Sequence, residues 1–214
     1  MASVVCMTFN DFRENTYLVY DETGECAVFD PGCYYPEEEQ ELIGKIAELK
    51  LKPVRLINTH CHLDHIFGNA LVAETYGLEL EIHPGELKVL EFAPQSAMMF
   101  GMPPGKPSPW PKLFIQEGDA IEFGNTRLEA LFTPGHSPAS LSFFCREDRF
   151  VIAGDVLFYG SIGRTDLPGG DFDTLIESIR EKLFPLGDDV VVYPGHERST
   201  TIGFERKNNP FLNQ

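Results

Sequence analysis

The stretch Thr59-His60-Cys61-His62-Leu63-Asp64-His65 places three imidazoles and a carboxylate close together in the sequence. It follows residues 54–57, an apolar run typical of a buried strand that ends just before it. Neutral imidazole and carboxylate are ligands for zinc, iron and manganese. The first two histidines, two residues apart on an extended chain, point to the same side and can share one ion. The aspartate and the last histidine follow a turn and can reach a second ion, so the stretch predicts a site for two metals.

Further candidate ligands lie elsewhere in the chain, each after a glycine. Two histidines lie in matching tripeptides, Pro134-Gly135-His136 and Pro194-Gly195-His196, and each tripeptide follows a run typical of a strand. Asp155 follows Gly154 at the end of another such run. Glycine lets the backbone turn sharply or approach closely, so we expect these ligands to converge at one rim of a sheet sandwich. The pattern argues against the alternative that the histidine-rich stretch is only a surface turn.

This ordered set of ligands resembles the metallo-β-lactamase superfamily along the whole length of the chain. The resemblance implies an α/β fold, the αβ/βα four-layer sandwich of two mixed β-sheets flanked by helices, with a dinuclear site at one edge. It implies two divalent metal ions as cofactors, zinc first and iron or manganese as alternatives. It also implies seven metal ligands: His60, His62 and His136 for a first ion, Asp64, His65 and His196 for a second, and Asp155 as the bridge.

Within the superfamily, the chain is most similar to the type II glyoxalases, which are hydroxyacylglutathione hydrolases, and specifically to their short single-domain branch. We therefore expect residues 1–214 to form one hydrolase domain without the C-terminal helical domain that helps full-length relatives to grip glutathione. Only 18 residues follow His196, which leaves the affinity for glutathione open. Zinc β-lactamases carry a cysteine at the position of Asp155, so the resemblance disfavours antibiotic hydrolysis.

The resemblance implies hydrolysis of a thioester such as S-lactoylglutathione by a metal-bridging hydroxide, which Asp64 orients. Arg164 matches a basic residue that contacts the thiol half of the substrate in the relatives, although it can also pair with Asp166 to pin its own loop. The sequence at residues 163–166 is shared with mononuclear-iron persulfide dioxygenases, which are the main alternative. Another ester or lactone hydrolase of the same fold also stays open.

The composition limits the environment and the partners. The chain is 43% hydrophobic and 23% charged, as in a soluble globular protein, with no apolar run of membrane-spanning length and no secretory signal. A net charge of −16 argues against nucleic acid or a membrane surface as the partner and is compatible with a small-molecule thioester at a metal site. The five cysteines include no C-x-x-C pair, so we expect reduced thiols and a cytoplasmic protein.

Hydrophobic patterning predicts three antiparallel strands before residue 30, a helix over 36–50, a helix over 66–76 and another over 84–92. It predicts a second, mostly antiparallel sheet that begins near residues 113–116 and a last long helix capped by Asp171 or Asp173. Residues 94–111 contain six prolines and predict an irregular segment. We interpret this segment as a lid beside the metals, a contact in a homodimer, or a loop packed on the core.

Three further side chains near the predicted site have alternative roles. Asp30, which precedes Pro-Gly, is either a turn residue or a support for the metal ligands from behind. His83 is interpreted as a structural residue at the end of a strand. Cys61 lies between two ligands but points the other way on an extended chain, so we exclude it from the ligand set.

Overall fold

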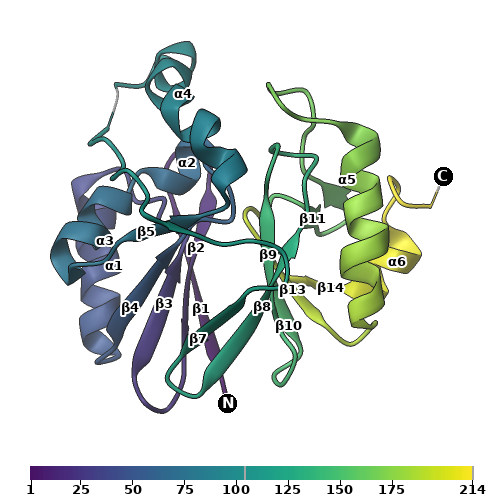
Figure 1. Ribbon diagram of the computed structural model, residues 1–214, viewed down its shortest axis with the longest axis horizontal. Helices are drawn as coiled ribbons and strands as arrows, with labels where there is room; N and C mark the ends of the chain where they lie inside the picture. The colour runs from purple at the N-terminus through teal and green to yellow at the C-terminus, as the bar shows by residue number, and fades with distance from the viewer. Residues whose placement is uncertain (104, 214) are drawn as a thin grey trace. The chain divides into compact units, whose positions relative to one another are not determined.

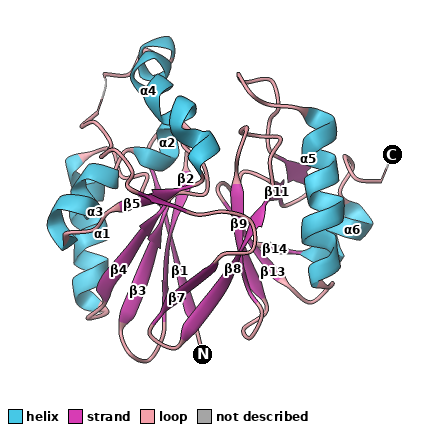
Figure 2. Cartoon of the chain, viewed as in Figure 1, coloured by secondary structure: helices cyan, strands magenta, loops and turns pink. Residues whose placement is uncertain are grey.

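The computed structural model describes residues 1–103 and 105–213. The chain divides into two compact units, Met1–Ile115 with Glu122–Thr126, and Gln116–Ile121 with Arg127–Gln214. Each unit contains a mixed β-sheet with helices beside it (Figure 2). The predicted α/β class with two mixed sheets flanked by helices is therefore confirmed. Among the described residues, no helix combines the length and the apolar character that crossing a membrane requires.

The sheet of the first unit has six strands in the order β1-β2-β3-β4-β5-β6. Figure 1 labels β1 to β5 of this sheet. The strands are β1 (Ser3–Phe9), β2 (Glu14–Tyr20), β3 (Glu25–Phe29), β4 (Lys52–Ile57), β5 (Leu80–Ile82) and β6 (Leu113–Phe114). The first three pair antiparallel, as predicted, and the pairings from β3 to β6 are parallel. The prediction that residues 113–116 begin the second sheet is wrong, because β6 takes its backbone partners from β5. Strand periodicity in a sequence carries no information about the partner strand.

Four α-helices belong to the first unit: α1 (Pro36–Glu48), α2 (Leu63–Ile66), α3 (Asn69–Tyr76) and α4 (Leu87–Met99), with a 3₁₀ turn (η1, Pro84–Glu86) before α4. Helix α1 starts on a proline and three glutamates, as the helix dipole favours, and buries Leu42 and Ile46 in the core beside Leu56. The helix predicted over 66–76 is divided between α2 and α3 around Gly68. A Cβ at Gly68 would lie 2.5 Å from the sulfur of Cys33, so only glycine fits at this position.

The prediction of an irregular segment over residues 94–111 is wrong for its first six residues, because α4 continues through Pro94 to Met99. Proline in a helix interior removes one hydrogen bond and costs about 3 kcal/mol. Leu90, Ala93 and Ala97 lie on one buried face of α4, and their burial offsets this loss. Residues 105–111 contain no helix or strand, as predicted, and Pro104 lies outside the described residues.

The sheet of the second unit has the order β14-β13-β10-β9-β8-β7. Its strands are β7 (Ala120–Phe123, which the division between the units crosses), β8 (Thr126–Phe132), β9 (Leu141–Cys145), β10 (Phe150–Gly154), β13 (Val191–Pro194) and β14 (Thr200–Thr201), beside a small hairpin of β11 (Leu157–Phe158) and β12 (Ser161–Ile162). Strands β8, β9 and β10 pair antiparallel, as do β13 and β14, and β10 pairs parallel with β13. The predicted mostly antiparallel sheet is confirmed.

The predicted last long helix is α5 (Phe172–Ser178), which continues through a π-helical turn (η2, Ile179–Leu183) and a 3₁₀ turn (η3, Phe184–Leu186); a short α6 (Ile202–Asn208) follows later. Asp171 is the cap, since its Oδ1 accepts a hydrogen bond of 2.8 Å from the amide of Thr174. Leu175, Ile179 and Leu183 form the buried face and pack in the core of this unit. The predicted cap and buried face are both confirmed.

Asp21, in the turn between β2 and β3, is expected to stabilise the first unit in a pH-dependent way. Burial raises its pKa, but hydrogen bonds from Thr23, Asn125 and Thr126 outweigh burial and lower the pKa to about 2. Asp21→Asn is expected to lower the free energy of unfolding by roughly 1–3 kcal/mol at pH 7.

The folded-state pKa of Asp21 lies below the ordinary value of about 3.9. Its contribution is therefore complete above about pH 4 and is lost as the pH falls toward 2. Urea unfolding of both proteins at pH 7, 4 and 3 measures the difference, which should shrink with falling pH. A difference that stays constant or grows would contradict this assignment.

Candidate metal centre

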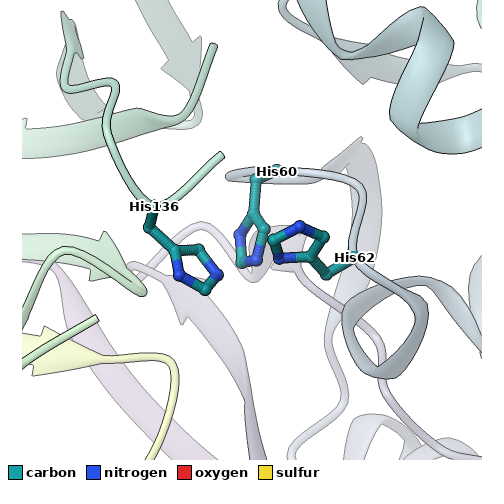
Figure 3. A group of neighbouring side chains, drawn as sticks. All are labelled: His60, His62 and His136. Atoms are coloured by element: carbon teal, nitrogen blue, oxygen red, sulfur yellow. The ribbon is translucent and has the colours of Figure 1, made fainter. Parts of the chain in front are cut away.

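The histidine-rich stretch lies just beyond the end of β4, and its second half forms the start of α2. His62 is the N-cap residue of α2, and Asp64 and His65 lie within this helix. The rings of His60 and His62 lie 4.8 Å apart and at 90° to each other, and those of His60 and His65 lie 4.1 Å apart. Figure 3 draws His60 and His62 together with His136 of the second unit. The stretch therefore gathers its imidazoles within the first unit, as the sequence predicts.

Asp30 lies behind this stretch and holds it in place. Its carboxylate, which is 1% exposed, accepts hydrogen bonds from the amide of Thr59 at 2.7 Å and from the Thr59 hydroxyl at 2.6 Å. Its Oδ2 lies 3.1 Å from Nδ1 of His65. A carboxylate on one ring nitrogen fixes the imidazole and leaves the other nitrogen to bind a metal. These contacts favour the supporting role of Asp30 over a simple turn role.

A second buried carboxylate, Glu14, lies near the same imidazole, and sequence reasoning missed it. Its Oε1 is 3.8 Å from Nδ1 of His65, its side chain is fully buried, and its Oε2 accepts a hydrogen bond of 3.1 Å from the Thr16 hydroxyl. The sequence signal was weak, because Glu14 is simply the first residue of a strand. Asn10, also missed, donates from Nδ2 to the carbonyl oxygen of Asp64 at 3.0 Å and so fixes the start of α2.

His83 has the structural role that the sequence predicts, and Cys61, which is excluded from the predicted ligands, is a buried core residue. Cys61 is fully buried among the hydrophobic side chains of the first unit, and burial raises the pKa of its thiol well above the usual value. Such a thiol is unreactive. His83 caps the 3₁₀ turn before α4, because its Nδ1 accepts a hydrogen bond of 3.0 Å from the amide of Gly85.

The second unit gathers its own three candidate ligands, His136, Asp155 and His196, around one oxygen atom. Oδ2 of Asp155 lies 3.4 Å from Nε2 of His136 and 3.4 Å from Nε2 of His196. Two ligand atoms at about 2.0–2.1 Å from one tetrahedral ion lie about 3.4 Å apart. The spacing therefore fits an oxygen that shares one ion with each histidine. Nδ1 of His136 lies 2.7 Å from the carbonyl oxygen of Arg164, which fixes the ring with Nε2 toward the aspartate.

The first unit also contains ligand atoms at a distance that suits one shared ion. Oδ2 of Asp64 lies 3.6 Å from Nε2 of His65, close to the spacing of two ligands on one ion. Ligand atoms of Asp30, His60 and His65 lie within 4.8 Å of one another, although Asp30 already bonds the far side of the His65 ring. Imidazole and carboxylate in these geometries are a donor set suited to divalent zinc, iron or manganese. The residues of both units thus fit metal binding.

Gly163→Ala is expected to disturb two of these ligands at once. A Cβ at Gly163 would lie 1.9 Å from the carbonyl oxygen of Asp155 and 3.2 Å from Cβ of His136. The backbone must shift, so we expect metal retained after dialysis against a chelator to fall about 10-fold or more. Elemental analysis measures this loss.

Gly44→Ala is the matched control, because a Cβ there meets nothing within 4 Å and α1 gains helix propensity of roughly 0.5–1 kcal/mol. Equal metal retention in the two variants would show that the loop does not position the ligands.

Arg164 is an exposed side chain paired with Asp166. Its Nε and Nη2 each donate a hydrogen bond of 2.7 Å to one oxygen of that carboxylate. The guanidinium lowers the pKa of Asp166 to about 2. This is the pairing that the sequence left open as the alternative to substrate binding. An exposed pair of this kind contributes at most about 1 kcal/mol, so Arg164 can exchange its partner at little cost.

Two mixed sheets flanked by helices, with histidines and aspartates where strands end, are typical of metal-dependent α/β enzymes. The family model of the metallo-beta-lactamase superfamily matches residues 10–196. The chain belongs to this superfamily.

The similar proteins place it among the metallo-hydrolases of the superfamily. Hydroxyacylglutathione hydrolase GloC of Haemophilus influenzae is 41% identical over 206 residues, which cover 94% of each protein. The crystal structure of BLEG-1 B3 metallo-beta-lactamase is 32% identical with a TM-score of 0.89 and covers 100% of both chains. That of TTHA1623 in a di-iron-bound form is 35% identical with a TM-score of 0.88 and covers 98% of this chain and 100% of its own.

Proposed function

We propose that the protein hydrolyses a thioester such as S-lactoylglutathione, with seven side chains holding two divalent metal ions. The observation that carries this proposal is the position of Asp155 Oδ2, equally distant from Nε2 of His136 and of His196. An oxygen at this distance from both histidines could share one ion with each of them and would then bridge the two ions. The 41% identity to a protein named as a hydroxyacylglutathione hydrolase supports the choice of a thioester.

The proposed ligands belong to both units of the chain. A first ion would be held by His60, His62 and His136, and a second by Asp64, His65 and His196, with Asp155 shared. Zinc is the proposed metal from the imidazole-rich donor set, and the di-iron form of a protein 35% identical makes iron the first alternative. Such ions supply a hydroxide nucleophile at neutral pH and polarise the thioester carbonyl.

The chain's own groups would orient the reactants. Asp64, whose side chain is 15% exposed, would accept a hydrogen bond from the attacking water and so aim it at the carbonyl carbon. The C–S bond then breaks, and the products are a carboxylic acid and a thiol. Arg164 would bind the thiol half through the same forked donors that now hold Asp166. We place the reaction in the cytoplasm, since all five cysteines are free thiols.

The alternative is a persulfide dioxygenase with one iron, which Gly163-Arg164-Thr165-Asp166 favours by resemblance. A β-lactam is a further substrate to test, because a B3 metallo-beta-lactamase is 32% identical along the whole chain. The aspartate at position 155, where zinc β-lactamases carry a cysteine, argued against antibiotic hydrolysis, and this similarity weakens that argument.

The deciding experiment counts metals per chain in protein purified without added metal and assays the same sample on each substrate. About two ions and turnover of S-lactoylglutathione support the proposal. One iron with oxygen uptake on a persulfide would replace it by the dioxygenase. Two ions with turnover of a β-lactam or lactone, but not of a thioester, would refute the substrate and retain the dinuclear centre.

A further inference from the structure

Arg198, two residues after His196, lies over the face of one ring of an aromatic stack. Its guanidinium carbon is 3.6 Å from the centre of the Tyr159 ring, and Tyr159 stacks on Phe204 with ring centres 4.8 Å apart at an interplanar angle of 16°. A guanidinium on an aromatic face keeps its N–H groups at its edge. The side chain of Arg198 is exposed, so this edge is accessible to a ligand.

A buried carboxylate, Glu205, fixes both segments that carry the stack. Its side chain is 0% exposed and accepts hydrogen bonds from the amide of Gly160, at 3.0 and 3.1 Å, and from the hydroxyl of Thr200 at 2.5 Å. Nδ2 of Asn209 donates to Glu205 at 2.8 Å and to the carbonyl oxygen of Ser161 at 2.9 Å. Gly160, next to Tyr159, and Thr200, two residues after Arg198, therefore both donate hydrogen bonds to the buried Glu205. A fully satisfied buried network of this kind holds the stack rigid.

The stack is connected to the metal ligands of the second unit. Phe158, which precedes Tyr159, lies edge-on to the ring of His196 with centres 6.0 Å apart. The hairpin of β11 and β12 that carries both aromatics begins two residues after Asp155. Arg198 thus lies two residues after one proposed ligand, and the ring that it covers is next in sequence to the ring that contacts that ligand.

The charge of Arg198 distinguishes it from most arginines of the same unit. Four others pair with carboxylates: Arg146 with Glu129, Arg149 with Asp189, Arg164 with Asp166 and Arg206 with Asp188. Within residues 1–103 and 105–213, no carboxylate pairs with Arg198, whose contact is the face of Tyr159. In a chain of net charge −16, a rigid exposed cation without an acidic partner is suited to an anion from outside the chain.

We propose that Arg198 determines specificity by binding a carboxylate of the substrate, on the part that leaves as the thiol. This inference rests on the proposed thioester hydrolysis and adds a residue that selects substrates whose thiol part carries a carboxylate. The planar guanidinium matches a carboxylate with two parallel N–H donors, whereas a lysine in its place would offer a point charge.

The test compares the holoenzyme with Arg198→Met, which keeps an apolar stem on Tyr159 and removes the charge, and with Arg198→Lys. Arg146→Ala is the matched control. Arg146 is exposed in the turn between β9 and β10, and this turn is at the end of β10 opposite to Asp155. Two thioesters of the same acyl group are assayed: S-lactoylglutathione, and the lactoyl thioester of N-acetylcysteamine, an uncharged thiol. Binding of glutathione itself is measured by calorimetry.

We expect Arg198→Met to raise KM for S-lactoylglutathione by about 10- to 100-fold, with kcat within about twofold, and to weaken glutathione binding by the same factor. KM for the uncharged thioester should not change, Arg198→Lys should lie between, and Arg146→Ala should match the wild type. Equal effects on both thioesters, or unchanged glutathione binding, would overturn the role of Arg198. Lack of turnover of either thioester by the wild type would refute the proposed function, while the binding measurement still decides the role of Arg198.

Discussion

Asp155→Asn is expected to remove at least one metal ion per chain and to lower turnover by more than about 100-fold. The carboxylate oxygen that lies 3.4 Å from both His136 and His196 is replaced by an amide, which binds a divalent cation weakly and cannot bridge two. Because Asn has the same shape as Asp, the strand end at Gly154 and the hydrogen bonds around it are retained. The loss should therefore come from the charge and not from misfolding.

Metal content by elemental analysis and thioester turnover on the same sample measure this effect. Asp173→Asn is the matched control, since Asp173 is exposed in the first turn of α5 and should retain both metal and activity. Full metal content with full activity in Asp155→Asn would exclude a bridging aspartate. Full metal content with lost activity would assign Asp155 to the chemistry and leave metal retention to the histidines.

Asp30→Asn is expected to weaken metal binding about 10- to 100-fold without changing a single proposed ligand. The Thr59 amide and Nδ1 of His65 bond different oxygens of the carboxylate, and an amide side chain has only one acceptor oxygen, so it cannot serve both. The imidazole therefore loses the carboxylate that fixes it and raises its basicity. Asp30 has a φ of 46°, a conformation that Asn adopts readily, so the substitution adds no backbone strain. The unpaired buried donors should also lower the free energy of unfolding of the metal-free protein by roughly 1–3 kcal/mol.

Competition with a chelator of known affinity measures the metal binding, and urea unfolding measures the stability. Asp11→Asn is the control for the first unit, because Asp11 accepts a hydrogen bond only at the surface, from the hydroxyl of Tyr35. A variant that is less stable but binds metal as tightly as the wild type would limit Asp30 to a role in folding.

Most of the fold could be predicted from the sequence where the signal is local. The strand runs, the helix that starts at Pro36 and the cap at Asp171 depend on neighbours a few residues away, and the structure confirms them. The failures have causes that are not local. Pro94 is accommodated because other residues of α4 are buried, and β6 joins the first sheet because β5 offers it a free edge.

The sequence by itself predicted which residues are candidate metal ligands, because imidazoles and carboxylates are the side chains that bind zinc, iron or manganese. Only the tertiary structure decided how these residues are held. Asp30 and Glu14 meet Nδ1 of His65 from positions 35 and 51 residues earlier, and Glu205 ties together two loops that lie far apart in the sequence. Such contacts depend on where sheets and loops cross in space, and no periodicity or spacing along the chain encodes that crossing.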